Sequence, residues 1–216
     1  MSGHDIIVIG ASAGGVEALV TLVGGLPADL PASIFVVLHI PPEGPSMLPT
    51  ILGRSGPLVA THPVDGTAIE QRHIYVAPPD HHMLLEQGRI RVIRGPRENR
   101  HRPAIDPLFR SAGVAYGPRV VGVILTGSLD DGTAGLEAIK QRGGVAVVQN
   151  YTEALFSSMP HSAVEHVKVD YVLSLSAIAE KLRELAHEVV KESEESPVSR
   201  NMETEVSMAK MQIPRK

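Results

Sequence analysis

The sequence predicts a single α/β domain with a doubly wound, mostly parallel sheet that is flanked by helices and carries an antiparallel β-hairpin insert. Two observations support this prediction. Residues 6–10 (IIVIG) and 33–40 (SIFVVLHI) are β-branched runs that are apolar on both faces, which is typical of strands covered by helices on both sides. Strand-like and helical patterns then alternate along most of the chain, as in folds built from parallel βαβ units.

A helix is expected between the first two strands. Val16, Leu19, Val20 and Val23 recur at helical spacing, and a glycine pair at 24–25 is typical of a helix end. Strand, helix and strand together predict a parallel βαβ unit at the amino end of the domain.

The region from residue 58 to residue 95 differs, because its strand-like runs are joined by short turns. The runs are HIYVAPP (73–79) and MLLEQGRIRVIRG (83–95), and Gln87-Gly88 suits a tight hairpin turn. We therefore expect an antiparallel insert here. A helix should follow, with Asp106 as its N-cap.

Alternation resumes in the second half of the domain. The expected elements are strands at 119–127, 145–150 and 170–175 and helices at 131–144 and 174–192. The last helix should present Ile178, Leu182, Leu185 and Val189 on one face. We place the domain at residues 1–190, and residues 191–216, which are charged and lack sustained periodicity, are expected to form a disordered tail.

Composition excludes several classes of protein. The 216 residues include no Cys, so covalent chemistry would need Ser, Thr, Lys or a carboxylate, and iron-sulfur clusters and Cys zinc sites are excluded. A formal net charge of -4 and an aromatic content of 3% argue against nucleic-acid binding. No apolar run approaches the ~18 residues of a membrane span, and the amino end lacks a secretory pattern. We therefore expect a cytoplasmic protein without membrane insertion.

The most informative motif is GASAGG at residues 10–15, between the first strand and the first helix, which fits G-x-S-x-G. At such a turn a serine hydroxyl stands out of the sheet, and free N–H groups at the helix start favour a developing oxyanion. Two alternatives remain, namely Ser12 as a plain helix cap and a dinucleotide-binding loop of an oxidoreductase. The second is disfavoured, because Ser12 replaces the second glycine of G-x-G-x-x-G and the second strand ends in His39 instead of an acidic residue.

Polar residues also follow two further strands. His39 ends the second predicted strand, and the loop after the strand at 119–127 contains Asp130 and Asp131. Since ligands of open parallel sheets bind outside the carboxyl ends of the strands, Ser12, His39 and one aspartate are expected to meet there. The aspartate would orient the imidazole and stabilise its protonated form. The alternatives are a satisfied histidine at a strand end and helix capping by Asp131. The chain order Ser, His, Asp argues against an ordinary lipase or esterase.

Six motifs lie in order along the chain. They are IVIGASAGGVEAL (7–19), VVLHIPP (36–42), IYVAPPDHHM (74–83), RPAIDPLFRSAG (102–113), LTGSLDDGTAGL (125–136) and the segment from VVQN to MPHSAV (147–164). Together they resemble the catalytic domain of the CheB family, the chemotaxis protein-glutamate methylesterases. The resemblance implies hydrolysis of γ-glutamyl methyl esters on the cytoplasmic helices of methyl-accepting chemoreceptors, with release of methanol, and in many members deamidation of receptor glutamines. It implies no metal and no organic cofactor.

The resemblance also implies a role for each site residue. By motif match, Ser12 is the nucleophile, His39 the base and Asp131 the orienting acid, while the neighbouring Asp130 is the weaker match. Backbone N–H groups of Ala13 and Ser128 would donate to the oxyanion.

Two departures from the family pattern affect the expected function. The family loop usually reads G-M-G-x-D-G, whereas residues 127–132 read GSLDDG, so Leu129 replaces a glycine and could alter the oxyanion hole. Regulated members also carry an amino-terminal phospho-acceptor domain, for which the 216 residues leave no room. We expect a constitutive esterase, a piece of a longer protein, or an enzyme controlled in trans by a separate response regulator or signalling partner. The alternative function is a non-catalytic CheB-like module that binds a signalling partner.

Two other polar clusters are weaker candidates. His81 and His82 are adjacent, so on a strand they would point to opposite faces, and no third ligand is evident; we expect no metal site. The arginines from 89 to 102 suit either a solvated hairpin face or a contact for an acidic receptor helix, a hypothesis that Arg97 and Arg100 would test.

Overall fold

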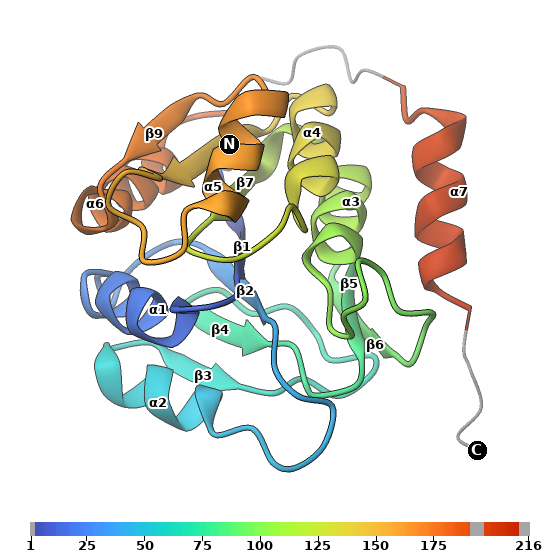
Figure 1. Ribbon diagram of the computed structural model, residues 1–216, viewed down its shortest axis with the longest axis horizontal. Coiled ribbons are helices and arrows are strands. Elements are labelled where there is room, and N and C mark those ends of the chain that lie inside the picture. Colours follow the sequence, from blue (N-terminus) through green and yellow to red (C-terminus); the bar gives the residue numbers. More distant parts are fainter. Residues whose placement is uncertain (1–2, 191–196, 212–216) are drawn as a thin grey trace.

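A seven-stranded parallel sheet forms the centre of the computed structural model, which describes residues 3–190 and 197–211 (Figure 1). The strand order is β3-β4-β2-β1-β7-β8-β9, so the chain winds outward from β1 in both directions, which is the doubly wound topology that the sequence predicts. The strands are β1 (Ile6–Ala11), β2 (Ser33–Leu38), β3 (Val59–Thr61), β4 (His73–Val76), β7 (Val120–Ile124), β8 (Val145–Gln149) and β9 (Tyr171–Leu173).

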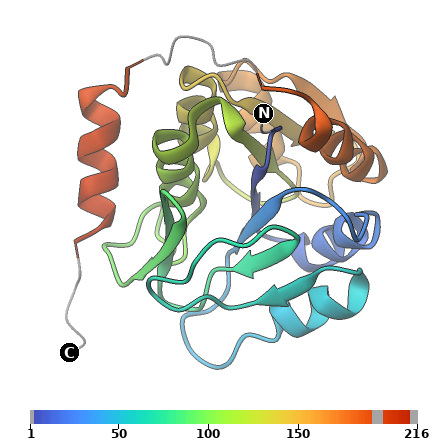
Figure 2. The same ribbon diagram turned by 180° about the vertical axis from the view of Figure 1, so that it is seen from behind.

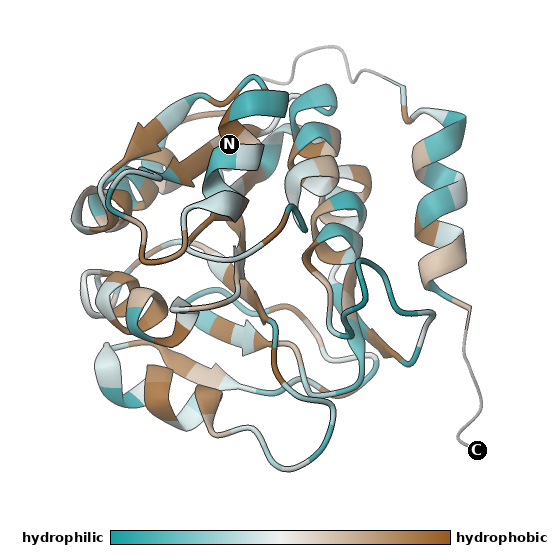
Figure 3. Cartoon of the chain, viewed as in Figure 1, coloured by the Kyte–Doolittle hydropathy of each residue, from teal (hydrophilic) through white to brown (hydrophobic). Residues whose placement is uncertain are grey.

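Helices cover both faces of this sheet, three on each (Figures 1 and 2). On one face lie α1 (Gly15–Gly24), α2 (Leu48–Ser55) and α6 (Leu175–His187), and on the other lie α3 (Ile105–Tyr116), α4 (Thr133–Gln141) and α5 (Ser158–His166). Side chains of β1 alternate between the two cores, with Ile7 and Ile9 in the first and Ile6 and Val8 in the second. Because both faces of the central strands β1, β2, β7 and β8 are buried, these strands are mostly apolar (Figure 3).

The antiparallel insert is smaller than the sequence predicts. Strands β5 (His82–Glu86) and β6 (Arg89–Ile93) form the hairpin, and Gly88 in its turn has the left-handed backbone that such turns favour, with φ of 74°. The prediction that residues 73–79 belong to the insert is wrong, because β4 pairs in parallel with β2 inside the main sheet. Its side chains contribute to both cores, which suits a covered strand better than a two-stranded ribbon.

Two helix ends differ from the prediction. Helix α3 begins at Ile105, so Asp106 lies in its first turn and is not its N-cap. The Asp106 carboxylate instead accepts the backbone N–H groups of Gly132 and Gly135, and it therefore caps α4. Helix α6 ends at His187, which leaves Val189 exposed beyond the helix and not on its buried face.

A helix also forms within the segment predicted to be a disordered tail. Helix α7 (Arg200–Ala209) begins after its N-cap Ser199 and packs beside α3 and the hairpin, where it buries Met202, Val206 and Ala209 (Figures 1 and 2). The prediction of disorder is wrong for these ten residues, since the spacing of the three side chains gives the helix an apolar face. Residues 191–196 and 212–216 of the predicted tail lie outside the described residues.

Three strand ends meet at one edge of the sheet. Strand β1 lies between β2 and β7, with Ala11 opposite Leu38 and Gly10 opposite Ile124, so the loops that follow these strands are neighbours. Ligands of open parallel sheets bind at such an edge. Of the helices in 3–190 and 197–211, none combines the length and the apolar character needed to cross a bilayer.

The substitution Val206→Asp should release α7 from the domain. It places an unpaired carboxylate in an apolar contact, at a cost of roughly 2 kcal/mol or more. Amide hydrogen exchange over residues 200–209 should then speed up at least about tenfold. Protection in the sheet should stay unchanged. Ser207→Asp, at an exposed position of the same helix, is the matched control and should keep α7 protected. Full protection of α7 in Val206→Asp would show that the apolar face does not hold it.

Candidate active site

Ser12 lies in the sharp turn between β1 and α1. Its N–H donates to the carbonyl of Thr126 just beyond the end of β7 (3.0 Å), which fixes the turn to the neighbouring strand. Gly14 caps α1 in a left-handed conformation, with φ of 72°. A Cβ atom at Gly15 would lie 2.6 Å from the Leu38 side chain, so this turn requires glycine for close packing. Ser12 is left half-buried at the sheet edge, where the motif predicts it.

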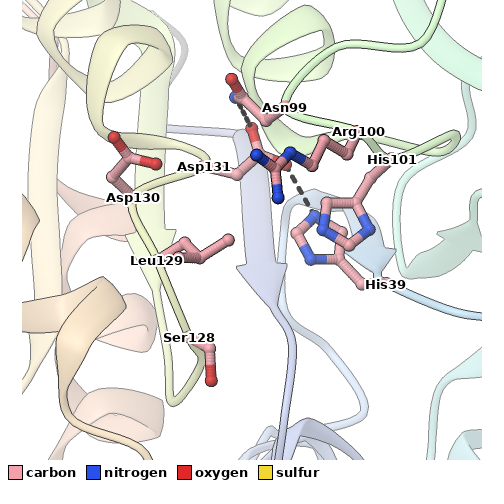
Figure 4. A pocket seen from close by; sticks show the side chains of 8 residues that line it. All are labelled: His39, Asn99, Arg100, His101, Ser128, Leu129, Asp130 and Asp131. Carbon is pink, nitrogen blue, oxygen red and sulfur yellow. Dashed lines mark hydrogen bonds and ion pairs between the residues drawn. The ribbon is translucent and has the colours of Figure 1, made fainter.

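His39 follows β2 and lies beside Ser12. Its Nδ1 is 3.0 Å from Oγ of Ser12, and its Nε2 is 2.7 Å from Oδ2 of Asp131. An ionised Asp131 accepts the Nε2–H, which leaves the Nδ1 lone pair to accept the Ser12 O–H. The imidazole of His101 stacks on that of His39 with ring centroids 3.6 Å apart (Figure 4). The structure therefore brings together the three residues that the sequence places at neighbouring strand ends.

Asp131 is buried and accepts four hydrogen bonds. Besides His39, Oδ2 accepts the N–H of Ile105 (2.8 Å), while Oδ1 accepts the Asn99 amide (2.7 Å) and the N–H of Asp106 (3.2 Å). Burial alone raises the pKa of this carboxyl, but the hydrogen bonds from His39, Ile105 and Asn99 outweigh burial and hold the pKa of Asp131 below its ordinary value. Asp131 is therefore negatively charged at neutral pH, as the orientation of an imidazole requires.

A second buried carboxyl, Asp106, lies next to Asp131. The Asn99 amide bridges the two, because it also donates to Oδ2 of Asp106 (2.8 Å). Burial and the negative charge of Asp131 raise the pKa of Asp106 to about 7, so Asp106 is mostly protonated below neutral pH. From the sequence, Asp106 is predicted only as a helix cap, and no pattern indicates a role for Asn99. Asp106 lies in the motif RPAIDP, but a sequence motif does not specify which side chains its residues contact.

The N–H groups of Ala13 and Ser128 are available at the site. Neither finds an acceptor among the residues that the structure describes. Leu129, the departure from the family pattern, has φ of 67°, in the left-handed region that favours glycine, and its N–H donates to Oγ of Ser158 (3.1 Å). The backbone of residue 129 is therefore in a conformation that favours glycine although the residue is leucine, and this conformation costs about 1–2 kcal/mol of folding free energy.

Two adjoining cavities open at this edge, of about 270 Å³ beside Asp131 and about 480 Å³ beside Ser12. His39, Arg100 and His101 line both of them, so we treat them as one surface, the Ser12 cleft. Figure 4 shows the first cavity between the loop that joins β7 to α4 and the loop that joins β6 to α3. An open cleft of this kind admits a side chain projecting from a larger partner.

The weaker candidates lie outside the hydrogen-bonded site. Asp130 is exposed at the rim of the Ser12 cleft, and its side chain takes no part in the network around Asp131. His82 is buried, donates through Nε2 to the carbonyl of Pro96 (2.7 Å) and accepts the N–H of Ala104; burial lowers its pKa. Within residues 3–190 and 197–211, no three His, Cys, Asp or Glu side chains lie close enough together to hold a metal ion.

Comparisons with known proteins agree on one family. Residues 7–182 match the family model described as CheB methylesterase. A Leptospira interrogans protein, provisionally named protein-glutamate methylesterase/protein-glutamine glutaminase, is 40% identical over 178 residues, which cover 82% of this chain and 92% of that relative. Protein-glutamate methylesterase/protein-glutamine glutaminase 2 of Methanosarcina mazei is 33% identical over 189 residues, covering 84% of this chain and 52% of the relative. The crystal structure of the Thermotoga maritima CheB methylesterase catalytic domain, 34% identical, superposes with a TM-score of 0.80 over 86% of this chain and all of that one.

The chain belongs to the CheB methylesterase family. Its general activity is therefore that of a protein-glutamate methylesterase, a carboxylic ester hydrolase, as the six motifs predict. The predicted fold is confirmed as well, because the CheB catalytic domain of Thermotoga maritima has the same architecture. The chain spans about half the length of the Methanosarcina relative and most of the length of the Leptospira relative.

The substitution Asp106→Asn should remove a pH dependence of stability from this CheB domain. The pKa of Asp106 is about 7 in the folded state against an ordinary 3.8, so the folded chain holds a proton that the unfolded chain releases. The contribution of Asp106 to the free energy of unfolding therefore falls as pH rises through this window, by about 2 kcal/mol between pH 5 and 7.5. The lowered pKa of buried histidines such as His82 acts in the opposite direction, so the comparison is between variants. In urea denaturation, wild type and the exposed control Asp29→Asn should each lose about 2 kcal/mol more stability between pH 5 and 7.5 than Asp106→Asn does. The same pH dependence in all three proteins would contradict the raised pKa.

Proposed function

We propose that the chain is a cytoplasmic serine esterase that hydrolyses glutamate γ-methyl esters on the cytoplasmic helices of methyl-accepting chemoreceptors. The observation that carries the proposal is the continuous chain of hydrogen bonds from Ser12 through His39 to the buried Asp131. A base held between a hydroxyl and an ionised carboxylate is the arrangement that nucleophilic ester hydrolysis needs. The names of the relatives support the class of ester.

In the first half of the reaction, Oγ of Ser12 attacks the ester carbonyl while Nδ1 of His39 takes its proton. The N–H groups of Ala13 and Ser128 stabilise the oxyanion of the tetrahedral intermediate. Asp131 stabilises the imidazolium, which then protonates the departing methoxide. Methanol leaves, and the glutamyl group remains as an ester on Ser12.

In the second half, His39 removes a proton from water as the water attacks the glutamyl ester on Ser12. Collapse of the second intermediate releases a free glutamate side chain and returns the proton to Ser12. A receptor glutamine would follow the same steps, with ammonia as the leaving group, and we include this deamidation as a second activity of the site. None of these steps uses a metal or an organic cofactor.

A non-catalytic binding module is the second candidate function, and Leu129 is the observation that favours it. A leucine in the oxyanion loop could distort the N–H of Ser128. The left-handed backbone of Leu129 and its hydrogen bond to Ser158 argue against distortion, because the loop has the conformation that a glycine would adopt. We therefore favour the enzyme.

The substitution Ser12→Ala should abolish methanol release from a methylated chemoreceptor, with kcat/KM falling by at least roughly 10⁴-fold because the nucleophile is lost. Ser176→Ala removes an exposed hydroxyl on α6 and is the matched control, which should keep the wild-type rate. If wild type releases no more methanol than Ser12→Ala, the esterase proposal fails for this substrate.

Leu129→Gly separates the two candidate functions. A small fluorophosphonate should label Ser12 in wild type, as detected by mass spectrometry, and the glycine variant should change the labelling rate by less than about threefold, because the backbone already has the required angle. Labelling that appears only in Leu129→Gly would show that the leucine disables the oxyanion hole, and it would favour the binding module.

A further inference from the structure

Arg97 and Arg100 lie exposed beside the Ser12 cleft, in the loop between β6 and α3. Both line the cavity that contains Ser12 and His39, and Arg100 also lines the cavity that contains Asp131. Neither forms an ion pair with a residue in the described part of the chain. Two guanidinium groups thus flank the site without a carboxylate of their own.

The other arginines of this basic run have carboxylate partners. The ion pairs are Arg89 with Glu86 (2.8 Å), Arg91 with Asp65 (2.8 Å), Arg94 with Asp80 (2.7 Å) and Arg102 with Asp80. These four side chains therefore stabilise the hairpin and the loop that follows it, and they are not a general basic face. The charge available to a partner is concentrated at the cleft.

Exposed apolar side chains lie near the other side of the cleft, close to the polar residues Ser128 and Asp130. Leu129 lines the cavity beside Asp131, and Leu155 and Phe156 lie against Gly14 in the turn that carries Ser12. The exposed fractions of these three side chains are 59%, 73% and 43%. The hydrogen bond from Leu129 to Ser158 joins the loop that carries Leu129 to the start of α5, just after Leu155 and Phe156. Large apolar side chains grouped at an exposed site are typical of a protein-binding surface.

The charged side chains of the cleft are also separated. Asp130 is exposed next to Leu129, whereas Arg100 lies across the cavity from it (Figure 4). A carboxylate that enters the cleft is repelled by Asp130 and attracted by the two arginines, so an acidic, amphipathic segment has one favoured orientation.

We propose that Arg97 and Arg100 are specificity-determining residues that select glutamyl esters flanked by carboxylates, an inference that rests on the proposed function. On a helix, residues three and four positions apart share a face, with Cβ atoms about 5–6 Å apart. A carboxylate at that spacing meets the arginines while the ester reaches Ser12, and Leu129, Leu155 and Phe156 contact apolar side chains on the other side of the same helix. Because the arginines act on binding, their loss raises KM and leaves kcat unchanged.

Two helical peptides, each with a single glutamyl methyl ester, test the inference through methanol release. One carries glutamate three and four residues from the ester on both sides, and the other carries glutamine at those positions. For wild type, KM should be roughly tenfold lower with the acidic peptide, and this preference should shrink as ionic strength rises. The double variant Arg97→Gln/Arg100→Gln should lose the preference and its salt dependence. The control Arg72→Gln changes an exposed arginine just before the amino end of β4, away from the carboxyl ends of the strands where the cleft lies. It should retain both the preference for the acidic peptide and its salt dependence.

The outcomes distinguish this inference from the proposed function. If wild type hydrolyses both peptides with equal KM, or if the preference survives in the double variant, the inferred role of the arginines is wrong, but the proposed function is not affected. No methanol from either peptide and none from the intact methylated receptor would overturn the proposed function itself.

The apolar side chains are tested separately. Leu155→Ser should raise KM for both peptides by the same factor, and an unchanged KM would show that Leu155 is not part of the binding surface.

Discussion

The buried carboxylate of Asp131 is the constraint on which the rest of the site depends. It accepts hydrogen bonds from three separate segments, namely His39 after β2, Asn99 in the loop after β6, and the first N–H groups of α3. A carboxylate at this depth without partners would cost several kcal/mol, and the positive end of the α3 dipole and these donors offset that cost. Because donors from all three segments stabilise this charge, the fold and the alignment of His39 with Ser12 are linked.

The sheet supplies the coarse positioning of these groups. His39 lies 27 residues from Ser12 and 92 residues from Asp131 in the chain, yet all three meet because β2 and β7 pair in parallel with the two sides of β1. Adjacent strands lie about 4.8 Å apart, so residues that follow their carboxyl ends are within side-chain reach. Hydrogen bonds of the loops then set the final orientation, including the tautomer of His39.

Sequence patterns predict the features that depend on nearby residues. Apolar runs predict most strands, and polar residues that follow strands indicate Ser12, His39 and the pair Asp130 and Asp131, of which the family motif selects Asp131. The same patterns do not reveal the role of Asn99, because its partners Asp106 and Asp131 lie 7 and 32 residues away in the chain. They also do not reveal that β4 pairs with β2, because the turns on either side of β4 do not specify its partner. Helices α2 and α5 are short, and α7 has only three buried side chains in a charged segment, so their periodicity is weak and packing decides their conformation.

The loop at Leu129 needs a particular pair of backbone angles, and the identity of the side chain changes only what those angles cost. A motif written in amino-acid letters counts leucine in place of glycine as a mismatch. The backbone angle at Leu129, φ of 67°, lies in the left-handed region that glycine adopts at little cost, so the leucine has a conformation suited to the glycine of the family pattern. Amino-acid identity and backbone angle therefore disagree about residues 127–132, and a motif that demands glycine at position 129 would exclude this chain.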